Sequence, residues 1–322
     1  SLAAQAECQR FQLEATYLTL SSSVVAAAVQ EASLRGQIAA TEETIRIETD
    51  LIDILRRQEA LGQIAMADVV LQESALAQAR QTLPPLQKQL EQQRDQLAAL
   101  AGGFPSERLL QTFTLDSLRL PRELPLSLPS RLVAQRPDVR AAEANLHAAS
   151  AQIGVAVAAR VPQITLTATL GSSALQAGNL FSSGYNFWNL AAGLTQPIFE
   201  GGALYHRQRA ARAAFDQAAA QYRSTVLSAF QNVADTLHAL QSDAIALRAA
   251  AAADSAAARS LAIVREQLRL GQVAYLSVLN AEQTSQQARL ALVQAQANRF
   301  ADTAALFQAL GGGWWNRADV AG

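Results

Sequence analysis

The sequence predicts a mainly α-helical protein of long coiled-coil helical hairpins in an internal repeat, with a small β-strand contribution. Three observations carry this prediction: one stretch occurs twice, long runs lack proline and glycine, and two short segments alternate apolar and polar residues. The chain has 322 residues, of which 50% are hydrophobic, so it can bury a large surface. Its net charge of −1 argues against a nucleic-acid partner.

The repeat is centred on the tripeptide Leu-Gly-Gln. The stretch "ALGQIAMADVVLQESALAQAR" (60–80) aligns without a gap with "RLGQVAYLSVLNAEQTSQQAR" (269–289) at an offset of 209 residues, and over residues 61–103 the two copies share 14 of 43 positions. The two copies predict two hairpins with the same turn. These turns are Leu61, Gly62 and Gln63 in the first copy, and Leu270, Gly271 and Gln272 in the second.

Residues 1–104 are predicted to form the first long hairpin. Proline is absent from 1–83, and the return helix of about 38 residues would be about 57 Å long. Apolar residues repeat every seven positions from Val69 to Leu97, which is typical of coiled-coil packing. Pro84 and Pro85 remove two backbone donors from this return helix, so we expect them to kink or break it.

Two segments separate this hairpin from the strands. Residues 105–137 are interpreted as a linker between the repeats, because the stretch 103–136 carries four prolines. Residues 138–162 are predicted to be a helix, with Asp138 near its start and apolar residues on one face from Val139 to Val157.

Residues 163–199 are predicted to form a β-hairpin. Both "QITLTATLG" (163–171) and "WNLAAGLTQ" (188–196) place oily residues on one face and small or polar residues on the other. Their length matches a tilted membrane-spanning strand. Aromatic residues lie towards the strand ends, where an interfacial girdle would be: Phe181, Tyr185, Phe187, Trp188 and Phe199.

A soluble hairpin packed on the helices remains an alternative, because strand signals are weak. Two strands leave two unpaired edges, which long coiled-coil helices offer no core to cover. The repeat predicts a further pair of strands before residue 1, so that several chains together could close a barrel.

Residues 200–311 are predicted to form the second hairpin, followed by a tail at 312–322. The run 203–270 contains neither proline nor glycine and can form one helix of 68 residues, about 100 Å long. Apolar residues along this run and after the second turn step by three and four, which again indicates a coiled-coil seam.

The sequence offers no recognisable catalytic or metal-binding motif. Its three histidines are far apart, and the lone Cys8 is expected to be a small buried hydrophobe. We therefore expect no enzyme activity, no cofactor and no metal site. The sequence contains no run of 18 apolar residues and therefore predicts no membrane-spanning helix. Residues 1–20 have the pattern of the middle of a helix, so we expect the chain to be an incomplete protomer.

Several motifs, in this order, resemble the outer-membrane factor family of tripartite efflux systems, the TolC-like channels, and in particular its lipoprotein branch that serves RND-type pumps. They are "AQRPDVRAAEANL" (134–146), "ITLTATLG", "LTQPIFEGG" (194–202), the repeated Leu-Gly-Gln hairpins and "LGGGW" (310–314). The resemblance implies a homotrimeric α/β-barrel channel, with twelve strands in the outer membrane of a Gram-negative bacterium and a tunnel of twelve helices extending into the periplasm.

The resemblance also implies a function and partners. The protein would be the exit duct of an efflux pump, in contact with outer-membrane lipid, a periplasmic adaptor (membrane fusion protein) and an RND-type inner-membrane pump. A lipid anchor would lie on a segment before residue 1, since Cys8 does not match the lipidation position. The alternative is a coiled-coil scaffold of the envelope or cytoplasm that forms no pore.

The family's functional positions transfer to the two turns and to the residues after the second turn. The resemblance implies that both Leu-Gly-Gln turns form the tip that meets the adaptor. It places a hydrophobic ring of the gate at Leu276, beside Tyr275, and the usual aspartate position on Asn280. That asparagine departs from the family pattern, so a cation-binding acidic ring is in doubt. Asp68 could supply acid near the mouth or could be a solvated residue of the tip.

Overall fold

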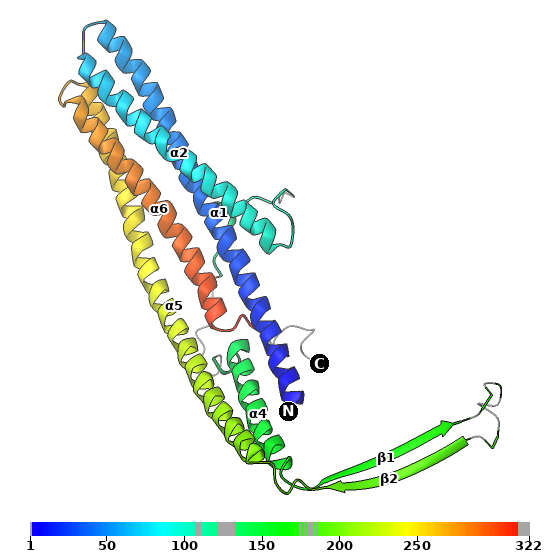
Figure 1. The fold of residues 1–322 in the computed structure, drawn as a ribbon. Helices are drawn as coiled ribbons and strands as arrows, with labels where there is room; N and C mark the ends of the chain where they lie inside the picture. Colours follow the sequence, from blue (N-terminus) through cyan, green and yellow to red (C-terminus); the bar gives the residue numbers. More distant parts are fainter. Residues whose placement is uncertain are drawn as a thin grey trace. The chain divides into compact units, whose positions relative to one another are not determined.

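The computed structural model describes residues 2–106, 111–121, 133–173, 175–176, 178, 183–184 and 186–314. Phe181 and Tyr185 of the predicted girdle, residues 122–132 of the linker and residues 315–322 of the tail lie outside the described residues. The elements, shown in Figure 1, are α1 (Leu2–Ala60), α2 (Met66–Leu100), the 3-10 helix η1 (Leu115–Ser117), α4 (Pro137–Ala158), β1 (Gln163–Ser172), β2 (Asn186–Thr195), α5 (Ala203–Arg269) and α6 (Tyr275–Ala309). No helix among the described residues has a stretch long and apolar enough to cross a membrane.

The chain divides into two compact units. The first comprises Ser1–Gln12 and Pro137–Leu227, and the second comprises Leu13–Arg136 and Ser228–Gly322. Helices α1 and α5 each contribute to both units. The prediction of one very long helix after the strands is confirmed, because α5 runs for 67 residues without interruption.

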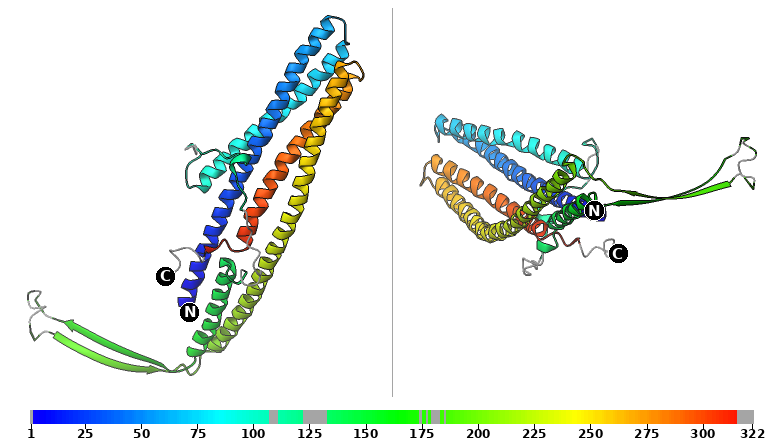
Figure 2. Two further views of the ribbon diagram at one scale, coloured as in Figure 1. Left: turned by 180° about the vertical axis from the view of Figure 1, so that it is seen from behind. Right: turned by 60° about the horizontal axis from the view of Figure 1, so that its bottom comes forward.

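The second unit contains most of two helical hairpins, α1–α2 from Leu13 onwards and α5–α6 from Ser228 onwards. They lie side by side in all three ribbon views, and their turns are at the same end of this unit (Figures 1 and 2). Helices α1 and α6 approach closely at Gly36, where an added Cβ would lie only 3.0 Å from Cγ1 of Val293. Neighbouring Ala32 and Ser33 are fully buried. Small residues therefore allow the two hairpins to meet along their helices.

Pro84 and Pro85 do not break the return helix, so that part of the expectation is wrong. Helix α2 continues through both prolines to Leu100. A proline in a helix leaves the carbonyl four residues earlier without its donor. Those carbonyls belong to Arg80 and Gln81, which are exposed, so water can satisfy them.

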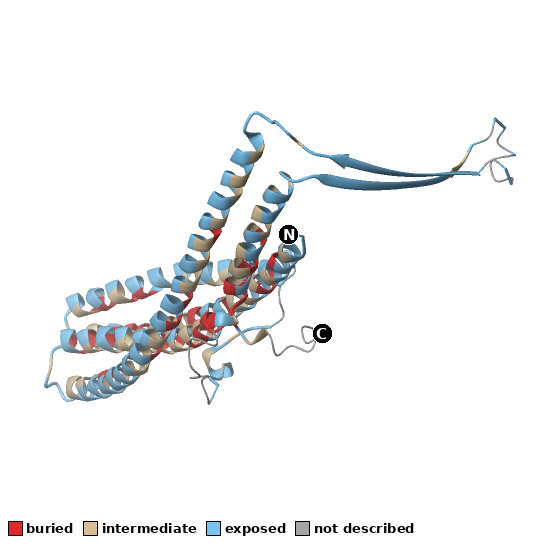
Figure 3. Ribbon diagram, turned by 90° about the horizontal axis from the view of Figure 1, so that it is seen from below, coloured by how far each residue is buried: buried red, intermediate tan, exposed pale blue. Residues whose placement is uncertain are grey.

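The first unit carries the two strands, which pair antiparallel in a single register. This register gathers the oily residues of both strands into cross-strand pairs on one face, namely Ile164 with Leu194, Leu166 with Ala192, Ala168 with Leu190 and Leu170 with Trp188. The threonines of β1 face the small and polar residues of β2. Nearly all residues of both strands are exposed in the isolated chain, as Figure 3 shows. The oily face therefore has no cover within the described part of the chain.

Helix α4 packs on the start of α1 within the same unit. Cys8 is buried against Ala141 and Ala144, which confirms the expectation of a small buried hydrophobe. Helix α4 begins at Pro137, a residue suited to a first helical position because its missing N–H would be unpaired there.

The C-terminal end of α6 is fixed within the second unit. Arg136 is buried, and its Nη1 donates a hydrogen bond of 2.9 Å to the carbonyl of Ala309. A cation at this place offsets the negative end of the helix dipole and satisfies a carbonyl that has no partner in the helix. Trp314 adds a second tie, because its Nε1 donates to the carbonyl of Gln135 at 2.8 Å.

Candidate functional site

Both Leu-Gly-Gln turns have the same backbone geometry. In the first turn, the N–H of Gln63 donates to the carbonyl of Gln58 at 2.9 Å and that of Gly62 donates to Glu59 at 2.8 Å. In the second, Gln272 donates to Gln267 and Gly271 to Leu268, both at 2.9 Å. This pair of bonds defines a Schellman motif, which closes a helix C-terminus by a residue with positive φ. Each turn therefore results from local sequence and reverses the chain in the same way.

Glycine is the favoured residue at the centre of each turn. Gly62 has φ +71° and Gly271 has φ +70°, in the left-handed region that favours glycine. An added Cβ would meet no atom within 4 Å at either position, so the turns are open towards their surroundings. Leu61 is 72% exposed and Leu270 is 54% exposed. Each turn thus presents an uncovered leucine beside its glycine, and Gln63 and Gln272 are exposed as well.

Tyr275 begins α6 and is buried between the two hairpins. It packs against Leu55 of α1 and Val69 of α2, and its hydroxyl donates a hydrogen bond to Oε1 of Gln72. Burial raises the pKa of this hydroxyl, and the nearby carboxylates of Glu282 and Glu48 raise it further. Tyr275 therefore joins the hairpins just behind their turns.

Leu276 and Asn280 occupy a different face of α6. They lie one helical turn apart, Leu276 is 53% exposed, and Asn280 is also exposed. Residues Val278 and Leu279 between them are buried. The structure thus brings Leu276 and Asn280 together on an uncovered stripe and places Tyr275 in the interior. Asp68, in the first turn of α2, is half-buried.

Sequence reasoning missed a buried polar cluster behind the turns. Arg265 of α5 forms an ion pair of 2.8 Å with Glu282 of α6, and Glu48 of α1 is buried nearby. Burial raises the pKa of Glu48 to about 7, and the negative charge of Glu282 adds to the effect. A signal for the ion pair was present, because Arg56 and Glu73 stand 209 residues before Arg265 and Glu282.

Within the described ranges, no group of three or more histidine, cysteine, aspartate or glutamate side chains is placed to hold a metal ion.

Comparison with known proteins agrees with this geometry. Residues 128–312 match the family model described as outer membrane efflux protein. The chain is 32% identical over 317 residues to the pyoverdine export outer membrane protein OpmQ of Pseudomonas putida, covering 96% of this chain. It spans 65% of the length of that relative.

Two solved structures have the same fold. A membrane protein from Pseudomonas aeruginosa matches with a TM-score of 0.89 at 27% identity, over 99% of this chain and 71% of its own. The open state of the MtrE outer membrane channel from Neisseria gonorrhoeae matches with a TM-score of 0.81 at 29% identity, over 95% of this chain and 69% of its own. The likeness therefore extends over both hairpins and the strand pair.

Proposed function

This chain belongs to the outer membrane efflux protein family, and we propose that it forms part of the wall of an exit duct. Through this duct, small molecules would pass from an inner-membrane pump and its periplasmic adaptor across the periplasm and the outer membrane. The proposal includes no enzymatic step. The observation that carries it is the strand register, which puts the oily residues of β1 and β2 on one uncovered face of a chain that also forms two long helical hairpins.

The strand pair supports contact with lipid. Ile164, Leu170 and Trp188 are largely exposed on the oily face. Burying a large apolar side chain is worth about 1.5–3 kcal/mol, so a face with six such side chains and two alanines favours an apolar environment. The threonines on the other face suit a wet interior. Pairing with strands of further copies would remove the two open edges.

A homotrimer would repeat the site three times around one axis. The open turns with Leu61 and Leu270 would form the tip that docks onto the adaptor. Leu276 would form an apolar ring just inside the tip, with Asn280 as an uncharged ring one turn deeper. Opening would then require the start of α6 to move. Helix shifts at subunit interfaces are a known kind of switching transition in proteins. The MtrE channel of Neisseria gonorrhoeae has been solved in an open state, which supports a gate in this family.

The test uses the full-length protein. It should require detergent for extraction from the outer membrane, and it should form ion-conducting channels in a planar bilayer. A non-pore scaffold predicts the opposite result: partition into the aqueous phase without detergent and no conductance. Either of these two results would refute the duct.

A further inference from the structure

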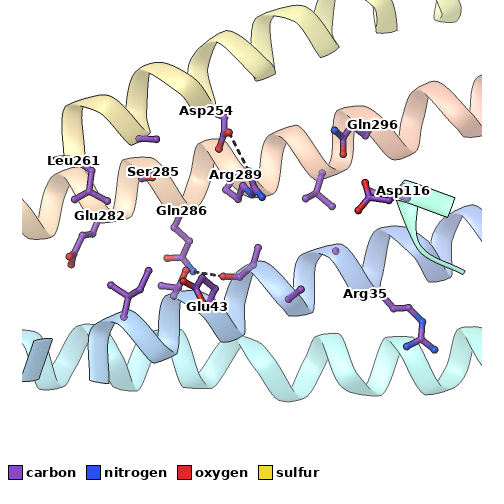
Figure 4. A pocket seen from close by; sticks show the side chains of 18 of the residues that line it. Arg35, Glu43, Asp116, Asp254, Leu261, Glu282, Ser285, Gln286, Arg289 and Gln296 are labelled. Atoms are coloured by element: carbon purple, nitrogen blue, oxygen red, sulfur yellow. Dashed lines mark hydrogen bonds and ion pairs between the residues drawn. The ribbon is translucent and has the colours of Figure 1, made fainter. Parts of the chain in front are cut away.

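The second unit contains a cavity that the proposed duct does not explain. It has a volume of about 590 Å³ and lies between α1, α5, α6 and η1. Figure 4 shows Glu282, Gln286 and Arg289 of α6 facing it across from α1, with Asp254 of α5 above and Asp116 of η1 at one side. This volume is within the usual range of about 300–1,000 Å³ for small-molecule sites.

The charges around the cavity do not balance. Its acidic lining residues are Glu43, Glu48, Asp116, Asp254 and Glu282. Its basic lining residues are Arg35, Arg265 and Arg289.

The arginines are already engaged. Arg265 pairs with Glu282 at 2.8 Å and Arg289 with Asp254 at 3.5 Å. Arg35 pairs with Glu31, which is outside the lining, at 2.6 Å. Among the described residues, no ion pair involves Glu48. An ionised Glu48 would therefore stand without a protein cation.

Two carboxylate oxygens in the wall lack hydrogen-bond partners. Glu48 is 6% exposed and Glu282 is 7% exposed, and in each the Oε2 atom has no partner among the described residues. A buried acceptor left unpaired costs about 1–3 kcal/mol, and more when it is charged. Rotation about the last side-chain bond of glutamate is broad, so the carboxylate of Glu48 can turn towards a ligand at small cost, while Arg265 holds that of Glu282 in place.

We propose that this cavity binds an organic cation with an apolar body, whose positive group is held by Glu48 and Glu282. The inference goes beyond the proposed duct and does not depend on it, because every lining residue belongs to one unit of a single chain. A cation lodged in the cavity would supply the positive charge that the two buried carboxylates lack, by direct Coulombic contact with their oxygens.

The lining favours an organic cation over a metal ion. No metal-binding group of three or more acidic, histidine or cysteine side chains occurs in the part of the chain that the structure describes. Apolar atoms of Ile47, Leu261 and Val293 contribute to the walls and would contact the body of the ligand. This combination of apolar walls and a few polar groups is typical of ligand sites.

Binding should be linked to loss of a proton. The pKa of Glu48 is raised to about 7, first by burial and then by Glu282. The other charged groups that line the cavity come from all four elements: Arg35 and Glu43 from α1, Asp254 and Arg265 from α5, Glu282 and Arg289 from α6, and Asp116 from η1. Near neutral pH Glu48 carries a proton for about half of the time, and an incoming cation would replace that proton. Affinity should therefore rise with pH through about 7.

The experiment measures binding of tetraphenylphosphonium to the full-length protein in lipid nanodiscs by equilibrium dialysis. For the wild-type protein, affinity should be about tenfold higher at about pH 8 than at about pH 6, in proportion to the ionised fraction of Glu48. Glu48→Gln should bind at least about tenfold more weakly at about pH 8 and should show no such pH dependence. Gln resembles the protonated side chain, so this variant should keep its fold.

Two controls separate the cavity from general binding. Glu42→Gln removes one negative charge from an exposed position of the same helix, outside the cavity lining, and should bind as wild type. Tetraphenylborate has the same shape and the opposite charge, and its binding should not weaken in Glu48→Gln. Equal phosphonium affinities for wild type and Glu48→Gln, or a flat pH profile of the wild type, would overturn the proposal.

Discussion

Arg265 and Glu282 are joined by an ion pair of 2.8 Å between Nη2 and Oε1, and the same two atoms join their repeat counterparts Arg56 and Glu73 at 2.7 Å. The internal repeat thus preserves a contact between the two arms of each hairpin as well as the turn. The surroundings differ, because the side chain of Glu282 is 7% exposed and that of Glu73 is 41% exposed. One pair lies against the other hairpin, while its copy faces outwards.

This difference predicts unequal costs for equivalent substitutions. Arg265→Met should leave a buried carboxylate unpaired and lower the free energy of unfolding by about 3 kcal/mol. Arg56→Met is the matched control and should cost about 0–1 kcal/mol, because Glu73 can be hydrated. Denaturant unfolding of the two full-length variants compares them. Equal losses would mean that burial of Glu282 has no energetic weight.

Tyr275 should stabilise the contact between the hairpins through its hydroxyl. Tyr275→Phe keeps the ring but leaves Gln72, which is fully buried, without this bond, at a cost of about 1–3 kcal/mol. The apparent melting temperature of the full-length protein should fall accordingly. Tyr205→Phe, at an exposed tyrosine, is the control and should leave it unchanged. An unchanged melting temperature of Tyr275→Phe would show that the hydroxyl is not needed.

The gate assignment predicts a change in conductance. Replacing both Leu276 and Asn280 with alanine should widen the proposed constriction and raise the single-channel conductance of the full-length protein in a bilayer. Ser277→Ala changes an exposed neighbour and should have no such effect. A double variant that conducts like the wild type would remove these two residues from the gate.

The docking assignment predicts loss of efflux when the second turn is blocked. Gly271→Trp places a large side chain where there is open space and should abolish efflux without lowering the amount of assembled protein in the membrane. Gly271→Asn controls for backbone strain, since asparagine tolerates positive φ better than other residues do, and it should retain efflux. Normal efflux in Gly271→Trp would exclude this turn from the adaptor contact.

The raised pKa of Glu48 predicts a pH dependence of stability. In the native state the carboxyl of Glu48 keeps its proton up to about pH 7, whereas in the unfolded chain it loses the proton near its ordinary pKa of 4.5. The native state is therefore favoured most strongly at low pH, and this contribution is lost as pH rises from about 4.5 to about 7. Melting temperatures measured across this window should fall less for Glu48→Gln than for the wild type. Parallel curves would contradict the shift.

The local features of the fold could be read from the sequence because neighbouring residues determine them. A helix that ends in a residue with a left-handed backbone favours glycine at that position, and Gly62 and Gly271 occupy such positions. The 67-residue length of α5 follows from the lack of proline and glycine in that part of the sequence. The strand register follows the alternation of oily and small residues. Pro84 misled the prediction, because whether a helix survives a proline depends on water at the freed carbonyl as well as on the proline itself.

The sequence by itself determined the repeat, the two turns, the long helices and the two-faced strands, since these depend on residues close together in the chain. Only the tertiary structure decided that Tyr275 lies inside while Leu276 stays uncovered, and that Glu48 and Glu282 share one buried region. Such differences arise when two hairpins meet face to face. The Arg265–Glu282 ion pair and its copy Arg56–Glu73 are then buried to different extents, and no pattern of neighbouring residues in the sequence predicts that difference.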